Sequence, residues 1–380
     1  MFYHLCELWF HRALAYQNPM FRATLAMIVA CVFVWAVGGR TIRMLVRLRI
    51  GDTAKFDHAM LDDYMHDKAN VPTMGGVMIL GAILFATLTM ARLDNFYVWM
   101  ALFCVVWLGT LGGADDYLKL TVGRRQGSRT GLKSYEKLLF QIALAVMLAY
   151  FIYHHGSRTD AMFARFRPTE ASIETYRIFT VPFYKGVFVL PLAVFMIVTV
   201  LVMAGTSNAV NFTDGLDGLA AGCTAMVSFF FMLLAYAIGR EGIASYLLMW
   251  HVPATDELAV PCGAACGACL GFLWFNCHPA RVFMGDTGSL PLGGLIGYVA
   301  IVLRQELILF IVGGVFVMEA VSVMMQVGYF KLTGGKRIFR VSPIHYHFRL
   351  GGWTESQTVI RFWLLAVVCA IVALLTLKLR

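Results

Sequence analysis

Ten long apolar runs, separated by short polar segments, take up most of this chain and leave few folds open to it. Apolar residue types fill 59% of the 380 positions and charged residues only 14%, whereas soluble domains contain roughly 25% charged residues. Inside a bilayer every backbone polar group must be paired within the protein, so runs of this length predict membrane-spanning helices. The sequence therefore predicts an all-α polytopic membrane protein, with one integral membrane domain over residues 1–380. The ten predicted helices lie near residues 23–39, 75–91, 97–113, 138–153, 186–205, 219–238, 257–275, 290–303, 307–330 and 360–377.

The distribution of Lys and Arg predicts which ends of these helices face the cytoplasm. Four alternate loops, 40–70, 115–137, 276–289 and 331–361, hold 19 of the 31 Lys and Arg residues. Cytoplasmic loops carry the excess of basic residues, so these loops are predicted to be cytoplasmic and both termini periplasmic. The net charge of +9 is then a topology signal, and no nucleic-acid partner is expected. Because no small-residue cleavage site follows the first apolar run, we expect that run to remain as a span.

Three of the nine cysteines cluster in the segment PCGAACGAC, at Cys262, Cys266 and Cys269. Their spacing places them on one face of a helix, among glycine and alanine residues. Small residues let membrane helices approach closely, and metal binding by this face is the less favoured interpretation. We therefore expect this segment to pack tightly against a neighbouring helix.

Five aspartates lie near the ends of predicted spans, in three glycine-containing motifs. Asp115 and Asp116 belong to GGADDYLK, Asp214 and Asp217 to NFTDGLDGL, and Asp286 to FMGDTGS. An acid close to the bilayer interior is costly, and all three motifs fall in loops predicted to face the cytoplasm. Any one of these aspartates, taken alone, could be a helix cap. Three motifs at one membrane face instead favour a shared functional site.

The residues around these acids indicate phosphate chemistry with a magnesium ion. Carboxylate oxygens without neighbouring Cys or His ligands favour Mg²⁺ over zinc, and Mg²⁺ often completes its coordination shell with substrate phosphates. Basic residues lie in the same loops, among them Lys68 before the glycine-rich PTMGG turn and Lys119 after the aspartate pair. Most of them are expected to set only the topology, and Lys68 is the best candidate to bind phosphate oxygens. Acids for a metal and bases for phosphates are the groups that phosphoryl transfer requires. The nucleoside-triphosphatase motif GxxxxGKS/T does not occur in the sequence.

The last predicted cytoplasmic loop carries two histidines, His345 and His347, in the segment PIHYHF. Their alternation predicts that both lie on one face of an extended segment, where they could bind a diphosphate or a sugar hydroxyl. Glu319 lies inside the ninth predicted span, and Gln326 lies two turns further on. An acid within a span indicates either a structural hydrogen bond to a neighbouring helix, which we favour, or the ion site of a transporter.

Five motifs follow one another along the chain. They are PTMGG (72–76), GGADDYLK (112–119), NFTDGLDGLAAG (211–222), FMGDTGSLPLGG (283–294) and the segment KLTGGKRIFR…PIHYHF. Together they resemble the phospho-N-acetylmuramoyl-pentapeptide transferases, the bacterial enzymes that make lipid I. The resemblance implies transfer of phospho-N-acetylmuramoyl-pentapeptide from its UDP conjugate to undecaprenyl phosphate, with release of UMP and a requirement for Mg²⁺. It also implies a homodimer in the bacterial inner membrane, with the active site facing the cytoplasm.

The resemblance also implies roles for individual residues. Asp286 is similar to the family's magnesium ligand, Asp115 to the group proposed to deprotonate the lipid phosphate, and Asp116 to its supporting neighbour. His345 falls in the family's catalytic histidine motif. The other matches are substrate-binding positions, with Phe283 as the ring that stacks on uracil: Lys68, Thr73, Asn211, Asp214, Asp217, Asn276, Phe283, Gln326 and His347. Tyr346 departs from the family's run of three histidines and cannot become cationic near neutral pH.

Two other functions remain open from the sequence. A UDP-N-acetylglucosamine:polyprenol-phosphate transferase shares the aspartate motifs, but the PTMGG and KRIFR…PIHYHF segments are features of the muramoyl type. A secondary transporter with ten spans would hold its polar groups near the middle of the membrane and not at one face. Covalent attack through an aspartate also remains an alternative to direct transfer.

Overall fold

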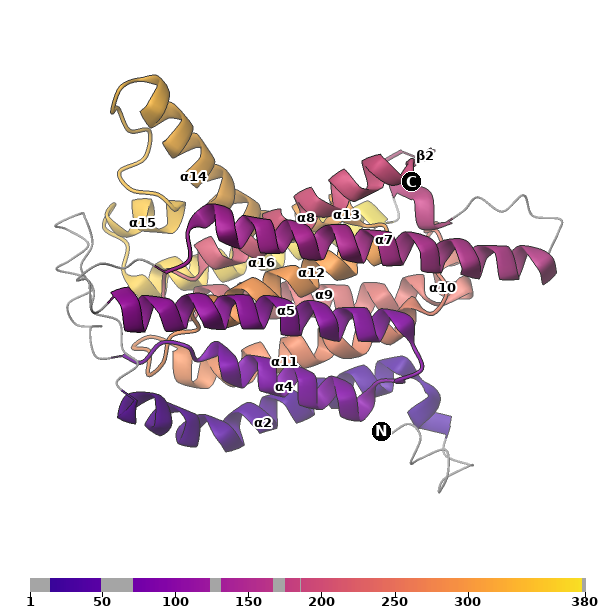
Figure 1. The fold of residues 1–380 in the computed structure, drawn as a ribbon, viewed down its shortest axis with the longest axis horizontal. Helices are drawn as coiled ribbons and strands as arrows, with labels where there is room; N and C mark the ends of the chain where they lie inside the picture. The colour runs from indigo at the N-terminus through magenta and orange to yellow at the C-terminus, as the bar shows by residue number, and fades with distance from the viewer. Residues whose placement is uncertain (1–13, 49–70, 124–130, 167–174, 185, 378–380) are drawn as a thin grey trace.

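The computed structural model describes residues 14–48, 71–123, 131–166, 175–184 and 186–377. Most of these residues form helices that run alongside one another (Figure 1). The long helices are α2 (Pro19–Arg47), α4 (Gly76–Met90), α5 (Phe96–Leu118), α7 (Ser134–Phe166), α8 (Leu192–Thr213), α9 (Leu219–Ile238), α11 (Ala259–Asn276), α12 (Asp286–Val302), α14 (Gly314–Leu332) and α16 (Glu355–Leu377). Shorter elements connect them: η1 (Leu14–Gln17), η2 (Lys119–Gly123), η3 (Thr175–Arg177), β1 (Ile178–Thr180), β2 (Val187–Val189), α10 (Glu241–Tyr246), η4 (Thr255–Leu258), α13 (Glu306–Val312) and α15 (Ile344–Arg349).

The prediction of an all-α polytopic membrane protein is confirmed. Among the described residues, eight helices are long and apolar enough to cross a membrane. Two shorter apolar helices, α4 and α12, accompany them. In order along the chain, these ten helices correspond to the ten apolar runs.

The predicted span at 186–205 begins later than expected, because a β-hairpin precedes it. Strands β1 and β2 pair antiparallel, and the helix α8 starts at Leu192, directly after Pro191. The strand sequence Val-Phe-Val is apolar and rich in β-branched residues, so hydropathy alone cannot separate it from the helix that follows.

Two other helices differ from their predicted spans. The span at 307–330 is interrupted at Gly313, where α13 ends and α14 begins. Helix α7 continues to Phe166, well past the predicted end at 153. Hydropathy identifies only the apolar part of a helix, which can lie in the bilayer. A polar segment can prolong the same helix beyond the bilayer.

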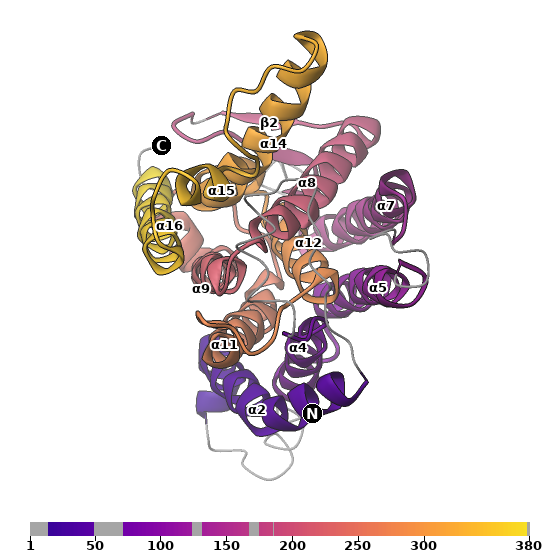
Figure 2. The ribbon, with the colours of Figure 1, turned by 90° about the vertical axis from the view of Figure 1, so that its left-hand side faces the viewer.

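Helix α12 lies at the centre of the bundle, surrounded by α4, α5, α8 and α9 (Figure 2). All 17 of its residues are buried. Glycine allows this close packing: an added side-chain carbon at Gly293 would lie 2.4 Å from the Thr206 carbonyl of α8, and one at Gly294 would lie 2.0 Å from Leu108 of α5. The short, glycine-rich eighth span is therefore enclosed by other helices.

Helices α11 and α2 pack with their backbones in contact. An added side-chain carbon at Gly267 would lie 1.9 Å from the Met27 carbonyl oxygen, and one at Gly263 would lie 2.4 Å from that of Ala23. The cysteines of the same helix are buried and carry free thiols. The prediction of small-residue helix packing for the PCGAACGAC segment is confirmed.

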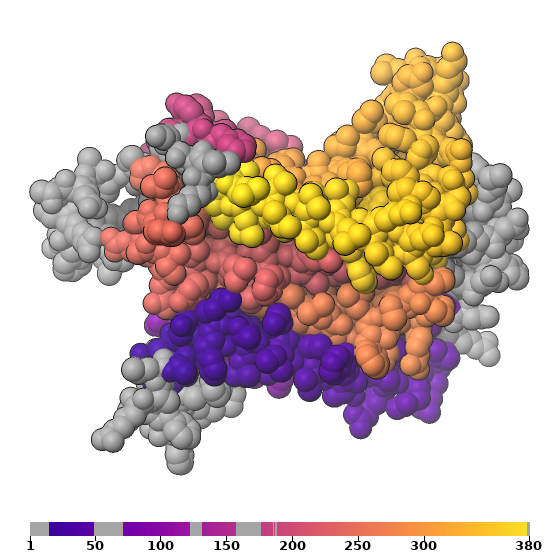
Figure 3. All heavy atoms as spheres, turned by 180° about the vertical axis from the view of Figure 1, so that it is seen from behind, coloured from indigo at the N-terminus to yellow at the C-terminus, as the bar shows by residue number. Residues whose placement is uncertain are grey.

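The loops that carry the acidic motifs gather at one end of the bundle, on the left in Figure 1. Helix α2 begins and α16 ends toward the opposite end. Helix α14 leans away from the other helices in Figure 2 and stands out from the molecular surface in Figure 3. The acidic end, which Figure 2 views directly, is thus flanked by one helix that projects to the side.

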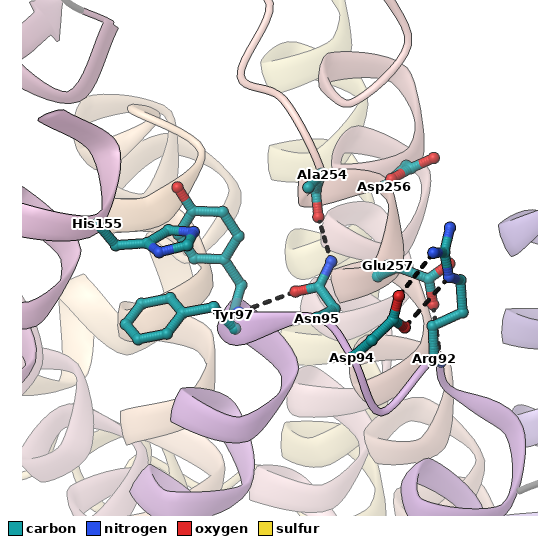
Figure 4. A pocket seen from close by; sticks show the side chains of 9 residues that line it. Arg92, Asp94, Asn95, Tyr97, His155, Ala254, Asp256 and Glu257 are labelled. Carbon is teal, nitrogen blue, oxygen red and sulfur yellow. Dashed lines mark hydrogen bonds and ion pairs between the residues drawn. The ribbon is translucent and has the colours of Figure 1, made fainter. Parts of the chain in front are cut away.

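A buried ion pair lies at the opposite end of the bundle. The guanidinium of Arg22, a fully buried side chain, donates to Glu257 Oε2 at 2.7 Å. Glu257 Oε2 also accepts the backbone N–H of Arg92 at 3.1 Å, beside a cavity of about 280 Å³ that Asn95 helps to line (Figure 4). Asn95 caps α5 by accepting the N–H of Tyr97 at 2.8 Å. These contacts join α2, α5 and η4 at this end of the bundle.

We expect Gly267→Ala to destabilise the protein, because the new methyl group would force α2 and α11 apart. The melting temperature in detergent should fall by several degrees. Gly205→Ala is the matched control within α8, since nothing lies within 4 Å of an added side-chain carbon there. Its melting temperature should stay the same or rise, because alanine favours the helix over glycine. Equal melting temperatures for the two variants would contradict the close packing of α2 and α11.

Candidate active site

Acidic residues from all three glycine-containing motifs meet at the first turn of α12. Asp115 and Asp116 lie in the last turn of α5, Asp214 directly follows α8, and Asp286 is the first residue of α12. One carboxylate oxygen from each of Asp115, Asp116 and Asp286 lies within 4.8 Å of the others. The structure thus brings together four of the five motif aspartates, whereas the Asp217 carboxylate contacts His278 and the Ala280 N–H instead.

Two of these acids hold the N-terminus of α12 in place. Asp116 accepts the backbone N–H groups of Asp286 at 3.3 Å and Thr287 at 2.9 Å, and the Thr287 hydroxyl at 2.7 Å. Asp214 accepts the N–H of Gly285 at 3.1 Å. The first N–H groups of a helix lack partners within it and carry partial positive charge, so nearby carboxylates stabilise them. The N-terminus of α12 is therefore capped, and the capping carboxylates come from α5 and from the residue that follows α8.

Glycines in two motifs permit this arrangement. An added side-chain carbon at Gly112 of α5 would lie 2.1 Å from the Asp286 carbonyl oxygen. One at Gly76 of α4 would lie 2.2 Å from the Gly288 nitrogen. The backbones of α5 and α4 thus contact the first turn of α12 on two sides. A residue larger than glycine at position 112 or 76 would prevent this contact.

Two lysine ammonium groups lie among the carboxylates. Lys119 Nζ is 2.7 Å from Asp115 Oδ2 and 3.1 Å from Asp286 Oδ2. Lys137 Nζ, from the first turn of α7, is 2.6 Å and 2.7 Å from the same two oxygens. Asp115 is fully buried and also accepts the N–H of Leu132 at 2.7 Å. Because four aspartates face two lysines here, the cluster keeps an excess of negative charge.

Asn211 fixes the orientation of the Asp286 carboxylate. Its Nδ2 donates to Asp286 Oδ1 at 2.8 Å and to Ser289 Oγ at 2.8 Å. Asp286 therefore presents Oδ1 to the amide and Oδ2 to the two ammonium groups. Burial, followed by the negative charge of Asp286, raises the pKa of Asp214 to about 7.

The donor set suits a hard divalent cation. Carboxylate oxygens that lie close together with excess negative charge are the groups that bind Mg²⁺, which takes its remaining ligands from water and phosphate. The Asp115, Asp116 and Asp286 group meets these requirements. A second group that could hold a metal ion by the same geometric criterion is formed by Asp217 and two residues outside the motifs, His278 and Glu355.

His345 and Glu319 form a fully buried pair. His345 Nδ1 lies 3.0 Å from Glu319 Oε2, and neither side chain is exposed. An ionised carboxylate only accepts hydrogen bonds, so we assign the proton to Nδ1. His345 Nε2 faces the loop after α8, since a side-chain carbon at Gly215 would lie 2.3 Å from it. Glu319 thus makes the predicted structural contact with a neighbouring helix, the short helix α15.

The prediction that His345 and His347 share one face of an extended segment is wrong. Both lie in the helix α15, where residues two positions apart point in different directions. His345 is buried, whereas His347 Nδ1 accepts the backbone N–H of Arg340 at 3.2 Å nearer the surface. Pro343, directly before the first helical residue, is compatible with a helix start. A six-residue helix is too short for hydrophobic periodicity to reveal.

Tyr346 contacts the same glycine as its neighbour His345. The Tyr346 hydroxyl donates to the Gly215 carbonyl at 3.0 Å. Two consecutive side chains of α15 therefore pack against the residue that follows Asp214. Tyr346, which interrupts the run of three histidines expected from the family, thus makes a defined contact in this chain.

Two predicted binding residues lie close to the acids. The Thr73 hydroxyl lies 3.1 Å from where a side-chain carbon on Gly285 would be. Phe283 is partly exposed, and its backbone N–H donates to the Pro72 carbonyl at 2.8 Å. Lys68 lies outside the described residues, so its predicted role stays a prediction.

Two other predicted binding residues hold loops together. Asn276 Oδ1 accepts the N–H of Gly218 at 3.0 Å, and its Nδ2 donates to the Val282 carbonyl at 2.9 Å. Gln326 Oε1 accepts the N–H groups of Ile338 at 3.2 Å and Phe339 at 2.9 Å. Their assignment to substrate stays a prediction.

Three residues at this end of the bundle escaped the sequence analysis. Lys137 lies at the start of a span, where a basic residue also serves as a topology signal. His278 Nδ1 lies 3.0 Å from Asp217 Oδ2, and Glu355 Oε1 accepts the Asp217 N–H at 2.9 Å. No sequence spacing connects residues from such distant segments. Lys137 lies directly before the predicted span 138–153 and Glu355 five residues before the predicted span 360–377, so a charged residue near the start of a span was the available signal.

Comparison with known proteins shows which family this sequence resembles. The profile of glycosyl transferase family 4 matches residues 96–304, and signature 1 of phospho-N-acetylmuramoyl-pentapeptide-transferase matches residues 68–80. The chain is 42% identical over 384 residues to the phospho-N-acetylmuramoyl-pentapeptide-transferase of Desulfotalea psychrophila, covering 100% of both chains. It is 42% identical over 366 residues to the protein of that name from Thermodesulfovibrio yellowstonii, covering 95% of this chain and 94% of the relative. The corresponding protein of Desulfosudis oleivorans is 41% identical over 372 residues, covering 96% and 95%.

We expect Gly285→Ala to lower transferase activity at least about a hundredfold, because the added methyl group would displace the Asp116 carboxylate. Gly285 has a φ of +73°, and an added side-chain carbon would lie 2.6 Å from Asp116 Oδ2. Gly334→Ala is the control for backbone strain alone, since Gly334 has a φ of +65° with open space around it. It should retain most of its activity. Equal activities for the two variants would show that the contact with Asp116 is unimportant.

Tyr346→Phe should lower activity several-fold, because the Gly215 carbonyl loses its donor. Tyr346→His restores the family's usual run of histidines and keeps a hydrogen-bond donor, so we expect it to be tolerated. Both variants are compared by their turnover rates, with melting temperatures as a check on folding. A large loss in Tyr346→His would indicate that the rest of the loop has adapted to tyrosine.

Proposed function

The chain belongs to the phospho-N-acetylmuramoyl-pentapeptide-transferase family, and we propose that it moves phospho-N-acetylmuramoyl-pentapeptide from its UDP conjugate to undecaprenyl phosphate. The products are lipid I and UMP. The observation that carries this proposal is the cluster of four aspartates and two lysines at one end of the bundle. Such a cluster can bind a metal and neutralise a diphosphate, which are the main requirements of phosphoryl transfer.

The reaction exchanges one diphosphate linkage for another. An oxygen of undecaprenyl phosphate forms a bond to the β-phosphorus of the UDP conjugate, and the bond from that phosphorus to the oxygen of UMP breaks. A phosphate monoester with a second pKa of about 6 is largely ionised at neutral pH, so the attacking oxygen needs no strong base. The reaction therefore depends on placement and charge neutralisation, and it requires no ATP.

Lys119 and Lys137 are the groups we expect to bind the diphosphate oxygens. Their side chains are 37% and 18% exposed, while both ammonium groups contact the fully buried Asp115. These contacts support a role for Asp115 in positioning the two lysines, beside the base role that the family resemblance implies. We propose that Asp286 holds Mg²⁺, which when bound would add positive charge beside the diphosphate. Asp116 keeps the first turn of α12 in position.

We expect the uridine of the donor to bind beside the loops that follow α8 and α11. Asn276 connects these loops through Gly218 and Val282. Phe283 is the partly exposed aromatic ring next to them, and uracil could stack on it. The buried His345, held by Glu319, supports the first of these loops at Gly215.

The lipid acceptor has an apolar tail that must remain in the bilayer. Helix α14 exposes apolar side chains beside the acidic end, among them Met324 and Phe330 at 62% and 44% exposure. We propose that the tail lies against this projecting helix (Figure 3). The excess of Lys and Arg in the loops at the acidic end supports a cytoplasmic orientation of the site in a bacterial inner membrane. The homodimer that the resemblance implies is part of the same proposal.

A transfer assay tests this function. Purified protein in detergent, with Mg²⁺ and undecaprenyl phosphate, is given either UDP-N-acetylmuramoyl-pentapeptide or UDP-N-acetylglucosamine. We expect lipid-linked product and UMP from the first donor alone. Product from the second donor alone would assign the chain to the N-acetylglucosamine transferases. No product from either donor with folded protein would refute the transferase function and favour a transporter.

Asp286→Asn should abolish turnover in this assay and leave the melting temperature near that of the wild type. The amide is similar in size to the carboxylate but lacks the charge that Mg²⁺ and the two lysines require. Asp94→Asn is the matched control, because Asp94 is exposed and pairs with Arg92 at the opposite end of the bundle. It should retain full activity. Full activity in Asp286→Asn would refute the metal assignment.

A further inference from the structure

Three residues from separate segments meet beside the loops of the proposed donor site. Asp217 lies between α8 and α9, His278 lies between α11 and α12, and Glu355 is the first residue of α16. His278 Nδ1 is 3.0 Å from Asp217 Oδ2 and 3.3 Å from Glu355 Oε2. Glu355 Oε1 accepts the backbone N–H of Asp217 at 2.9 Å. The proposed function uses neither His278 nor Glu355.

The imidazole of His278 lies between two carboxylates: its Nδ1 hydrogen-bonds to Asp217 Oδ2 and lies 3.3 Å from Glu355 Oε2, without a hydrogen bond to it. The side chains of Asp217 and Glu355 are each 2% exposed, whereas that of His278 is 41% exposed. Two buried carboxylates repel each other and lose hydration unless donors or cations lie between them. The Ala280 N–H also donates to Asp217 Oδ2, at 3.1 Å. His278 and Ala280 together hold the Asp217 carboxylate against the loop that precedes α12.

This contact joins the two loops between which we expect the donor nucleotide to bind. Asp217 follows Asp214 by three positions, on the loop that caps Gly285. His278 lies on the loop that leads to Phe283 and then to Asp286. Glu355 ties the Asp217 backbone to the start of α16. A shift of this cluster would change the distance between the two loops without removing any acid from the cluster at α12.

We propose that His278 is a positioning residue for the donor nucleotide: together with Glu355 it holds Asp217, and so fixes the spacing of the two loops that form the donor pocket. This inference rests on the proposed function. The residue acts through Asp217, so its effect is confined to the UDP-linked substrate. The lipid acceptor, whose tail we expect beside α14, should bind independently of it.

Steady-state kinetics with each substrate varied in turn test this role. His278→Ala should raise KM for the UDP conjugate about tenfold, while KM for undecaprenyl phosphate and kcat each change less than about threefold. His278→Asn should restore most of the affinity, because its amide can donate from near the position of Nδ1. His251→Ala is the matched control, since His251 Nε2 contacts the Gly239 carbonyl at 3.2 Å in another part of the bundle. Its kinetics should match those of the wild type.

A double variant separates positioning from a general structural effect. In an Asp217→Asn background, His278→Ala should raise KM for the donor less than about twofold further, because both changes act on the same contact. Independent, multiplying effects would overturn the proposal, as would equal changes in both KM values or no change with His278→Ala. A metal ion present in the purified wild type and lost in His278→Ala would instead assign a metal site to the cluster.

Binding of UMP, measured by calorimetry, distinguishes this inference from the proposed function. Weaker UMP binding in His278→Ala than in the wild type supports the positioning role even if no transfer is observed. Transfer by the wild type together with unchanged UMP binding in His278→Ala overturns the positioning role and leaves the proposed function in place. Melting temperatures of all variants establish that each protein is folded.

Discussion

Backbone contact between α12 and its neighbours is the constraint on which the acidic site depends. Gly112 of α5 and Gly76 of α4 allow those helices to touch the first turn of α12. The contact at Gly112 brings Asp116 within hydrogen-bond distance of the N–H groups that begin α12. Asp286, the first residue of that helix, then lies beside the carboxylates of α5. A central helix enclosed by protein thus determines where each motif acid can lie.

The charges of the site are partly balanced across the same contact. The N-terminus of a helix attracts anions, which lowers the cost of gathering carboxylates there. Lys119 and Lys137 offset part of the remaining negative charge, and both contact Asp115 and Asp286. Four aspartates against two lysines leave this neutralisation incomplete. A divalent cation or a lysine-bound phosphate would each change this balance, so we expect metal binding and substrate binding to be coupled.

The sequence was sufficient to predict the spans and to predict that motif acids gather at one site, because hydropathy and clustered aspartates are signals that local residues carry. It was not sufficient for contacts between distant segments. Lys137 and His278 have no motif, and their roles appear only when α7 and the loop before α12 lie beside the acids. The break at Gly313 and the β-hairpin were missed because apolar composition does not distinguish a continuous helix from an interrupted one or from a strand. The helix that holds His345 has six residues, fewer than two turns, and is too short for any periodic pattern.

Binding of Mn²⁺ to the purified protein, followed by electron paramagnetic resonance, tests most directly whether the three motifs form one metal site. Mn²⁺ substitutes for Mg²⁺ on oxygen ligands and can be observed as it binds. We predict saturable binding of about one ion per chain, with an affinity at least about tenfold lower in Asp286→Asn and unchanged in Asp94→Asn. Absence of saturable binding, or an unchanged affinity in Asp286→Asn, would contradict a metal site at the first turn of α12.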